Sequence, residues 1–296
     1  MRGPVVPETR PDPGHDICVE HRISQVTECA AMIADLFDAF FFDLDGVVYV
    51  GKRTTPGAAE TITALRERGK AVRFLTNNPM DRARIARRLS SYGVDADVGE
   101  VITAGWAAAH YLRERGTKRA WVLGEIGLHD EITQAGILEV EGEGCEAVVV
   151  GWDDAVTLGV VRYAALAIKK GADFVATNVD STYPTLEGDM AGVGAVVAAL
   201  ATGSGREPVV VGKPFPPMFQ AAIDSVGVPR SRIVMIGDTP ESDILGAHRA
   251  GIASLLMGDV AAPPEADPGH PNGRVQTLRD LLTPGGAARV FLHPKG

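Results

Sequence analysis

Four short segments of this 296-residue chain place polar side chains directly after an apolar run. They are Asp43-Leu44-Asp45-Gly46, Thr76-Asn77-Asn78, Gly212-Lys213-Pro214 and Gly237-Asp238, the last with Asp243 five residues on. Carboxylates, a lysine and hydroxyl groups can together hold a hard metal ion and stabilise a transferring phosphate. Each segment alone is also a common turn or helix cap, but four in this order, each at a strand end, indicate one reaction centre.

The elements that must position these groups alternate along the chain. Strands are predicted at 39–44, 71–75, 100–104, 120–123, 147–151, 174–177, 208–212 and 233–237. Helices are predicted at 24–37, 56–68, 81–92, 106–115, 158–170, 192–201, 217–226 and 241–250. This alternation predicts an α/β fold with a doubly wound parallel sheet. Ligands of such sheets gather beyond the carboxyl ends of the strands, where the four segments lie.

The composition is that of a globular chain of about two domains. Apolar residues make up 45%, and no apolar run approaches the ~20 residues that span a bilayer. We therefore expect no membrane partner. The cysteines are odd in number and widely spaced, which predicts neither a disulfide framework nor a zinc site and favours the reducing cytoplasm. They are Cys18, Cys29 and Cys145.

The net charge of −9 argues against a nucleic-acid partner. Arg82, Arg84, Arg87 and Arg88 crowd one predicted helix, but at helical spacing they spread over more than one face, so we interpret them as solvated surface. An acidic chain that binds an anion must supply positive charge locally, from a metal, a lysine or backbone N–H groups.

The four segments resemble the four motifs of the haloacid dehalogenase superfamily, specifically of its NagD-like, p-nitrophenyl-phosphatase-type branch. The resemblance covers roughly residues 37 to 257 and includes further stretches at 176–180, 184–188, 192–195, 210–214 and 238–247. It implies a Rossmann-like core with an inserted α/β cap. It also implies a phosphatase that acts on a small phosphorylated metabolite, such as a nucleoside monophosphate, sugar phosphate, glycerol phosphate or phosphoglycolate.

The resemblance assigns a role to each acidic residue. Asp43 is implied to be the nucleophile that forms an aspartyl-phosphate, and Asp45 the general acid and base. The implied cofactor is Mg²⁺, held by Asp43, the backbone carbonyl of Asp45 and Asp238, with Asp243 acting through a water or from behind these ligands. Lys213 is implied to neutralise both the nucleophile and the phosphate.

Phosphate binding is implied for the second segment. Thr76 offers a hydroxyl, and Thr76, Asn77 and Asn78 lie at a predicted helix N-terminus, where backbone N–H groups favour anions.

The resemblance also divides the chain. Residues 1–36 form an N-terminal extension, partly disordered because of its prolines; 37–117 and 208–296 form the core, and 118–207 form the cap. Asn178, Asp180 and Tyr183 match a substrate-facing loop of the cap, although a purely structural capping role is an equal alternative. We also leave open a homodimer that forms through the cap.

Three rival functions stay open at this point. A phosphotransferase or mutase would use the same Asp43 chemistry but generally has a smaller cap. A phosphonatase would need a Schiff-base lysine from the cap, where Lys118, Lys169 and Lys170 match helix ends and solvated surface. A non-catalytic phosphate-ester-binding protein would be expected to lack Asp43 or Asp45.

Overall fold

The computed structural model describes residues 31–78, 81–185 and 188–290, with the side chains of 183–185 and 288–289 excepted. Most of the predicted N-terminal extension, and the first half of the helix predicted at 24–37, lie outside these residues. The helix that is described there, α2, covers Ile33–Leu36. Within the described residues, no helix has the length and apolarity needed to span a membrane.

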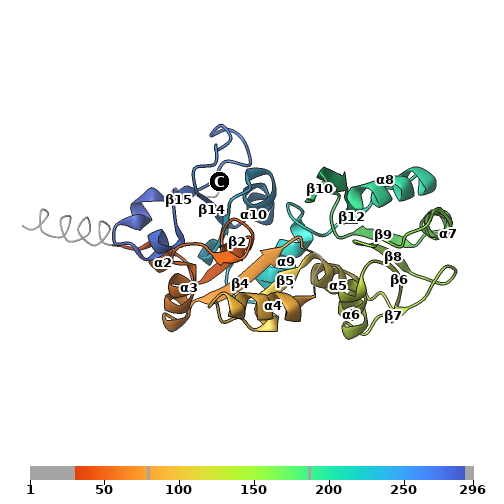
Figure 1. Ribbon diagram of the computed structural model, residues 1–296, viewed down its shortest axis with the longest axis horizontal. Helices are drawn as coiled ribbons and strands as arrows, with labels where there is room; N and C mark the ends of the chain where they lie inside the picture. The colour runs from red at the N-terminus through yellow and green to blue at the C-terminus, as the bar shows by residue number, and fades with distance from the viewer. Residues whose placement is uncertain (1–30, 79–80, 186–187, 291–296) are drawn as a thin grey trace, which may run out of the picture.

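A parallel six-stranded sheet forms the predicted core, in the order β15-β14-β13-β1-β4-β5 (Figure 1). Its strands are β1 (Ala39–Asp43), β4 (Ala71–Thr76), β5 (Val101–Thr103), β13 (Ile233–Gly237), β14 (Ala253–Met257) and β15 (Gly273–Val275). In this register Asp43 lies beside Leu75, and Phe42 lies beside Ile236. The carboxyl ends of β1, β4 and β13 therefore meet at one edge.

Helices cover both faces of this sheet, as a doubly wound fold requires. Phe41 points to the face packed by α5 (Ala104–Glu114), α9 (Pro216–Asp224) and α10 (Leu245–Ala250). Phe40 and Phe42 alternate to the other face, which α3 (Ala58–Glu67) and α4 (Arg82–Ser91) cover. The predicted α/β class and parallel core are thus confirmed.

A second sheet of five parallel strands, in the order β12-β9-β8-β6-β7, lies at the other end of the long axis. Its strands are β6 (Arg119–Leu123), β7 (Leu138–Glu139), β8 (Ala147–Val150), β9 (Asp173–Ala176) and β12 (Val209–Val210). Its helices are α6 (Ile126–Gln134), α7 (Leu158–Lys169) and α8 (Val193–Ser204), and the hairpin β10 (Thr182–Thr185)–β11 (Gly188–Ala191) adjoins it.

The strand predicted at 208–212 does not lie where we expected it. We placed it in the catalytic core, but Val209 and Val210 pair with Val175 and Ala176 of β9 in the second sheet. An apolar run fits an edge of either sheet, and the pattern of these few residues does not distinguish them.

The two sheets share one apolar cluster. It runs from Phe41 and α5 through Leu128 and Ile132 of α6 to Val149 of β8. A buried ion pair of 2.6 Å between Arg82 and Glu131 reinforces the same contact.

The remaining elements are short. They are the hairpin β2 (Tyr49–Val50)–β3 (Arg53–Thr54), a π-helix at Pro240–Ile244, and 3₁₀ helices at Val98–Glu100, Arg230–Arg232, Leu278–Leu282 and Gly286–Arg289. The hairpin follows Asp43 and Asp45 directly, so it borders the reaction centre.

Candidate active site

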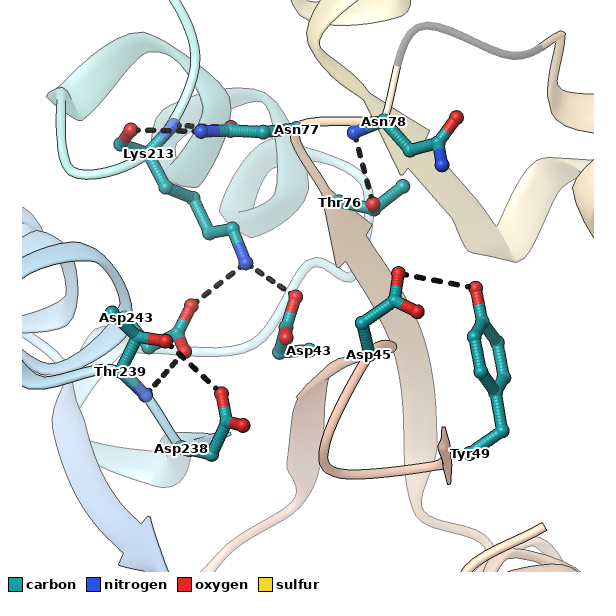
Figure 2. A network of polar contacts seen from close by, with 10 residues as sticks. All are labelled: Asp43, Asp45, Tyr49, Thr76, Asn77, Asn78, Lys213, Asp238, Thr239 and Asp243. Carbon is teal, nitrogen blue, oxygen red and sulfur yellow. Dashed lines mark hydrogen bonds and ion pairs between the residues drawn. The ribbon is translucent and has the colours of Figure 1, made fainter. Parts of the chain in front are cut away.

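The four polar segments come together at one end of the core sheet (Figure 2). Asp43 ends β1, Thr76 ends β4, and Asp238 follows the last residue of β13. Lys213 arrives differently, on the segment that returns from β12 of the second sheet to α9. The site is therefore built at the junction of the two sheets.

Lys213 lies between two carboxylates. Its Nζ donates to Oδ1 of Asp43 at 2.5 Å and to Oδ1 of Asp243 at 2.7 Å. The side chains of Lys213 and Asp243 are only 4% and 1% exposed, so the attraction acts with little screening. Burial alone would lower the pKa of Lys213, but attraction by Asp243 and Asp43 raises it above its ordinary value. The lysine is therefore held charged.

The pKa of Asp43 is affected more by burial than by its ion pair with Lys213. Burial raises the pKa of Asp43 to about 7, opposed by attraction from Lys213 and aided by repulsion from Asp243. The carboxylate is thus costly to ionise without further positive charge nearby.

The backbone of Lys213 is fixed by Asn77. The Lys213 N–H donates to Oδ1 of Asn77 at 2.8 Å, and Nδ2 of Asn77 donates to the Lys213 carbonyl at 3.1 Å. A Cβ on Gly212 would overlap Oδ1 of Asn77 and the carbonyl of Thr177. We expected Asn77 to bind phosphate; in the structure its side chain binds the backbone of Lys213 and thereby positions that residue.

Thr76 and Asn78 form the turn beside Asp43. The buried hydroxyl of Thr76 accepts the backbone N–H of Asn78 at 3.0 Å. Both residues line the same cavity as Asp43. The predicted phosphate seat is therefore next to the predicted nucleophile.

Asp45 lies on the side of Asp43 away from Asp238 and Asp243 and is exposed. Oδ2 of Asp45 is 3.5 Å from the hydroxyl of Tyr49, a long hydrogen bond. Tyr49 is buried, its carbonyl accepts the Gly46 N–H at 2.8 Å, and the Arg88 guanidinium lies 4.5 Å from its ring centroid. The sequence did not single out Tyr49, because the contact depends on how the hairpin folds back.

Three carboxylates form a candidate divalent-metal site. Oxygens of Asp43, Asp238 and Asp243 all lie within 4.8 Å of one another. Gly46 has φ of +84°, and a Cβ there would overlap the Asp238 carboxylate, so the loop passes close to the cluster. Burial and repulsion by Asp243 raise the pKa of Asp238. Three acids against one lysine leave excess negative charge, and all-oxygen donors suit Mg²⁺ or Ca²⁺.

A cavity of about 660 Å³ opens onto Asp43 between the two sheets. Its core side carries the predicted Asp43, Asp45, Thr76, Asn77, Asn78 and Lys213, and its cap side the predicted Asn178 and Asp180. The other lining residues are Arg84, Glu125, Trp152, Thr182, Gly192, Val193 and Ser242. Asp238 and Asp243 are not among the lining residues: Asp243 is buried and pairs with Lys213, and Asp238 is half-buried beside Gly46.

We did not predict Glu125 and Trp152 as site residues, although their positions after strands indicate it. Each lies two residues beyond the end of a strand of the second sheet, after β6 and β8 respectively. The rule that ligands gather at the carboxyl ends of parallel strands identified the core residues, and it applies equally to this sheet.

Two of the predicted cap residues, Asn178 and Asp180, line the cavity. Oδ1 of Asn178 accepts the Asp180 N–H at 3.2 Å, so Asn178 shapes the loop as well as lining the cavity. Burial raises the pKa of Asp180, with Lys213 opposing the rise. The backbone of Tyr183 lies in β10, but its side chain is outside the described residues.

Comparison with known proteins identifies the family. Residues 40–138 match the family model of haloacid dehalogenase-like hydrolases, and residues 210–281 match a related HAD-hydrolase-like model. The chain is 32% identical over 260 residues to phosphoglycolate phosphatase 1A, chloroplastic, of Arabidopsis thaliana, which covers 79% of this chain and 72% of that protein.

Two solved structures share the fold. Glycerol phosphate phosphatase of Mycobacterium tuberculosis in complex with magnesium superposes with a TM-score of 0.76 at 33% identity, over 84% of this chain and 78% of that one. NagD of Escherichia coli K-12 gives 0.75 at 28%, over 82% and 97%. The predicted NagD-like branch is thus confirmed.

Proposed function

Because this chain belongs to the haloacid dehalogenase-like hydrolases, we propose that it hydrolyses phosphate monoesters with Asp43 as nucleophile and Mg²⁺ as cofactor. It is a phosphatase of small phosphorylated metabolites, as its relatives are. The observation that carries the mechanism is the contact between Lys213 and Asp43 at the wall of a cavity that Asp45 also lines.

In the first step, an oxygen of Asp43 attacks phosphorus and the bond to the leaving alcohol oxygen breaks. Asp45 gives its proton to that oxygen, so the alcohol leaves neutral. The phosphoryl group is then bonded to Asp43, and Lys213 and the backbone N–H groups near Thr76 offset the charge on its oxygens.

In the second step, Asp45 takes a proton from a water molecule as the water attacks phosphorus. The bond between phosphorus and the Asp43 oxygen breaks, which restores the carboxylate and releases inorganic phosphate. Asp45 regains the proton it needs for the next turnover. Tyr49 orients Asp45 throughout.

The donors present fit a hard divalent cation, which we propose is Mg²⁺. Asp43, the carbonyl of Asp45 and Asp238 would hold it, with Asp243 behind them. When bound, the ion offsets the charge repulsion between the carboxylates and the phosphate. A relative with a magnesium complex supports this choice.

The test is a single-turnover experiment with a radiolabelled phosphate ester. Wild type should transiently carry label that hydroxylamine releases, as an acyl-phosphate does. Asp43→Asn should carry none and lose at least about 10²-fold in kcat with an unchanged circular dichroism spectrum. Asp130→Asn, an exposed acid on α6, is the matched control.

An Asp43→Asn protein that keeps normal turnover would contradict the proposal. So would label that appears on a second sugar hydroxyl rather than in inorganic phosphate, because that product belongs to a phosphotransferase.

The substrate class is proposed from the relatives. Phosphoglycolate and glycerol phosphate are both small esters. The cap side of the cavity offers Glu125, Asn178 and Asp180 to the hydroxyls of a glycerol leaving group, whereas Glu125 and Asp180 repel the carboxylate of phosphoglycolate. We propose that residues 118–207 act as the cap that selects among them. A phosphate-release screen over a panel of esters identifies the best substrate.

The assembly and location are proposals as well. Leu158, Tyr163 and Leu166 of α7 expose 65%, 68% and 44% of their surface, which suits a homodimer formed through the cap. Sedimentation of wild type against Tyr163→Glu tests it. The spacing of the cysteines favours the cytoplasm, which cell fractionation tests.

A further inference from the structure

A basic groove of about 580 Å³ adjoins the active site and has no part in the mechanism above. Lys52 of the β2–β3 turn lines one side, and Arg84, Arg87, Arg88, Ser91 and Tyr92 of α4 and its end line the other. Arg84 lines both this basic groove and the cavity that holds Asp43. The cavity and the basic groove are therefore adjacent, and the Arg84 side chain borders both.

The sequence interpretation of these arginines as dispersed surface was only partly right. Arg82 does leave the cluster and pairs with Glu131. Arg84, Arg87 and Arg88 lie three and four residues apart, which places them on one face of α4. With Lys52 opposite, they concentrate four positive charges in a chain whose net charge is −9.

The cations of the basic groove are not equally engaged. Arg88 is fixed, since it donates to the Gly51 carbonyl at 2.9 Å and stacks over Tyr49. Lys52, Arg84 and Arg87 are exposed, and no ion pair of their side chains occurs among the described residues. Their charge is available to an anion that enters from the active site.

The cap side of the cavity has the opposite character. It presents the carboxylates of Glu125 and Asp180, which repel an anion and suit hydroxyl groups. A leaving group with a second acidic function is thus disfavoured at the cap and attracted toward Arg84. Guanidinium groups bind carboxylate and phosphate through paired hydrogen bonds.

We propose that the basic groove is a subsite for a second acidic group of the substrate, a phosphate or carboxylate at the far end of the leaving group. It extends the accepted esters to dianionic metabolites, whose reacting phosphate lies at Asp43 and whose other end lies among Lys52, Arg84 and Arg87. This inference rests on the proposed phosphatase function.

The test compares two substrates that differ only in the second phosphate. One is fructose bisphosphate, and the other is the fructose monophosphate whose single phosphate is the one that the enzyme removes from the bisphosphate. With Mg²⁺ at low ionic strength, Arg87→Glu should lower the ratio of their kcat/KM values, bisphosphate over monophosphate, by at least about tenfold. Lys52→Glu, on a different element, should lower it in the same sense, and Arg87→Lys should restore most of it. Added salt should reduce the wild-type ratio by screening.

The matched control is Lys169→Glu, the same charge change at an exposed residue of α7, which should leave the ratio as in wild type. A second measurement is independent of turnover. In an Asp43→Asn background, calorimetry should show weaker binding of fructose bisphosphate when Arg87→Glu is added.

An unchanged ratio and unchanged binding in both Glu variants would overturn the subsite. Equal losses for the two substrates would also overturn it, because they would place the effect on Asp45 or on the fold. Failure of the phosphatase proposal gives a different result, in which wild type releases phosphate from no ester of the panel.

Discussion

The two walls of the active-site cavity are built in opposite ways. On the core wall, Asp43 and Lys213 are buried and held by ion pairs, one of them from Lys213 to the buried Asp243, and by the Asn77 amide. On the cap wall, Asn178 is buried, but the acidic side chains of Glu125 and Asp180 are exposed and form no ion pair among the described residues.

This difference indicates that the core wall carries out the reaction and that the cap wall selects the substrate. Buried charges in low dielectric keep one geometry and act strongly on a phosphate, but each depends on the others. An exposed side chain interacts weakly, so it can be exchanged without harm to the fold. Substitutions on the core wall should therefore abolish catalysis and destabilise the protein, whereas those on the cap wall should only reorder substrates.

The largest effect is expected for Lys213→Met. It leaves Asp43 and Asp243 buried without their cation, so the free energy of unfolding at neutral pH should fall by about 3–5 kcal/mol and turnover should be lost. Urea denaturation of metal-free protein measures the loss. Lys169→Met, on the exposed face of α7, should change stability by less than about 0.5 kcal/mol.

Adding Asp243→Asn to Lys213→Met sharpens this test. Removal of one unpaired carboxylate should recover part of the lost stability, a coupling that a double-mutant cycle reports. Losses that simply add would show that the ion pair does not support the core wall.

Removal of the metal should come next. Chelation with EDTA should reduce activity to background, Mg²⁺ should restore it, and Ca²⁺ should restore it poorly because its larger, looser shell disturbs in-line geometry. Full activity in chelator would refute the metal site.

The Mg²⁺ requirement should also depend on pH. Burial raises the folded-state pKa of Asp43 from 3.8 to about 7, so between these values the folded, metal-free protein holds a proton that the unfolded chain has lost. Rising pH in this window thus destabilises the metal-free protein, and the cation must displace that proton. The half-saturating Mg²⁺ concentration should fall as pH rises toward about 7 and level off above it. A titration that is flat with pH would contradict this role of Asp43.

Asp45→Asn should have an intermediate effect, because the Asp45 side chain is exposed and accepts a long hydrogen bond from Tyr49 rather than a buried ion pair. Hydrolysis of an alkyl phosphate should slow by about 10²–10⁴-fold, since a poor leaving group needs the proton. Release of p-nitrophenol in the first step should slow much less. Equal losses in the first step for both esters would remove Asp45 from the general-acid role.

The smallest effect is expected for Asp180→Ala on the cap wall. Ratios of kcat/KM across a panel of phosphate esters should shift by about 10–100-fold, while the Mg²⁺ requirement and the unfolding midpoint stay near those of wild type. Asp130→Ala on α6 serves as the control. An unchanged substrate ranking would place selection on the core side or in the basic groove.

Much of the core wall could be predicted from sequence, and little of the cap wall. Asp43, Thr76 and Asp238 follow strands that the apolar pattern predicts, and parallel strands bring their carboxyl ends together. Strands β14 and β15 and helix α6 were not predicted. β15 has only three residues and α6 buries only two aliphatic side chains, Leu128 and Ile132, but β14 is as long and as apolar as β13 and could have been predicted.

By itself, the sequence determined the chemistry and the fold class, since both follow from residue type and local pattern. The tertiary structure alone decided which groups meet: Lys213 reaches Asp43 from 170 residues away, and Asn77 fixes it from 136. It also decided that β12 joins the second sheet and that Arg84 lines both the active-site cavity and the basic groove. These contacts depend on register and packing between distant segments, which burial of the whole core sets and no local pattern records.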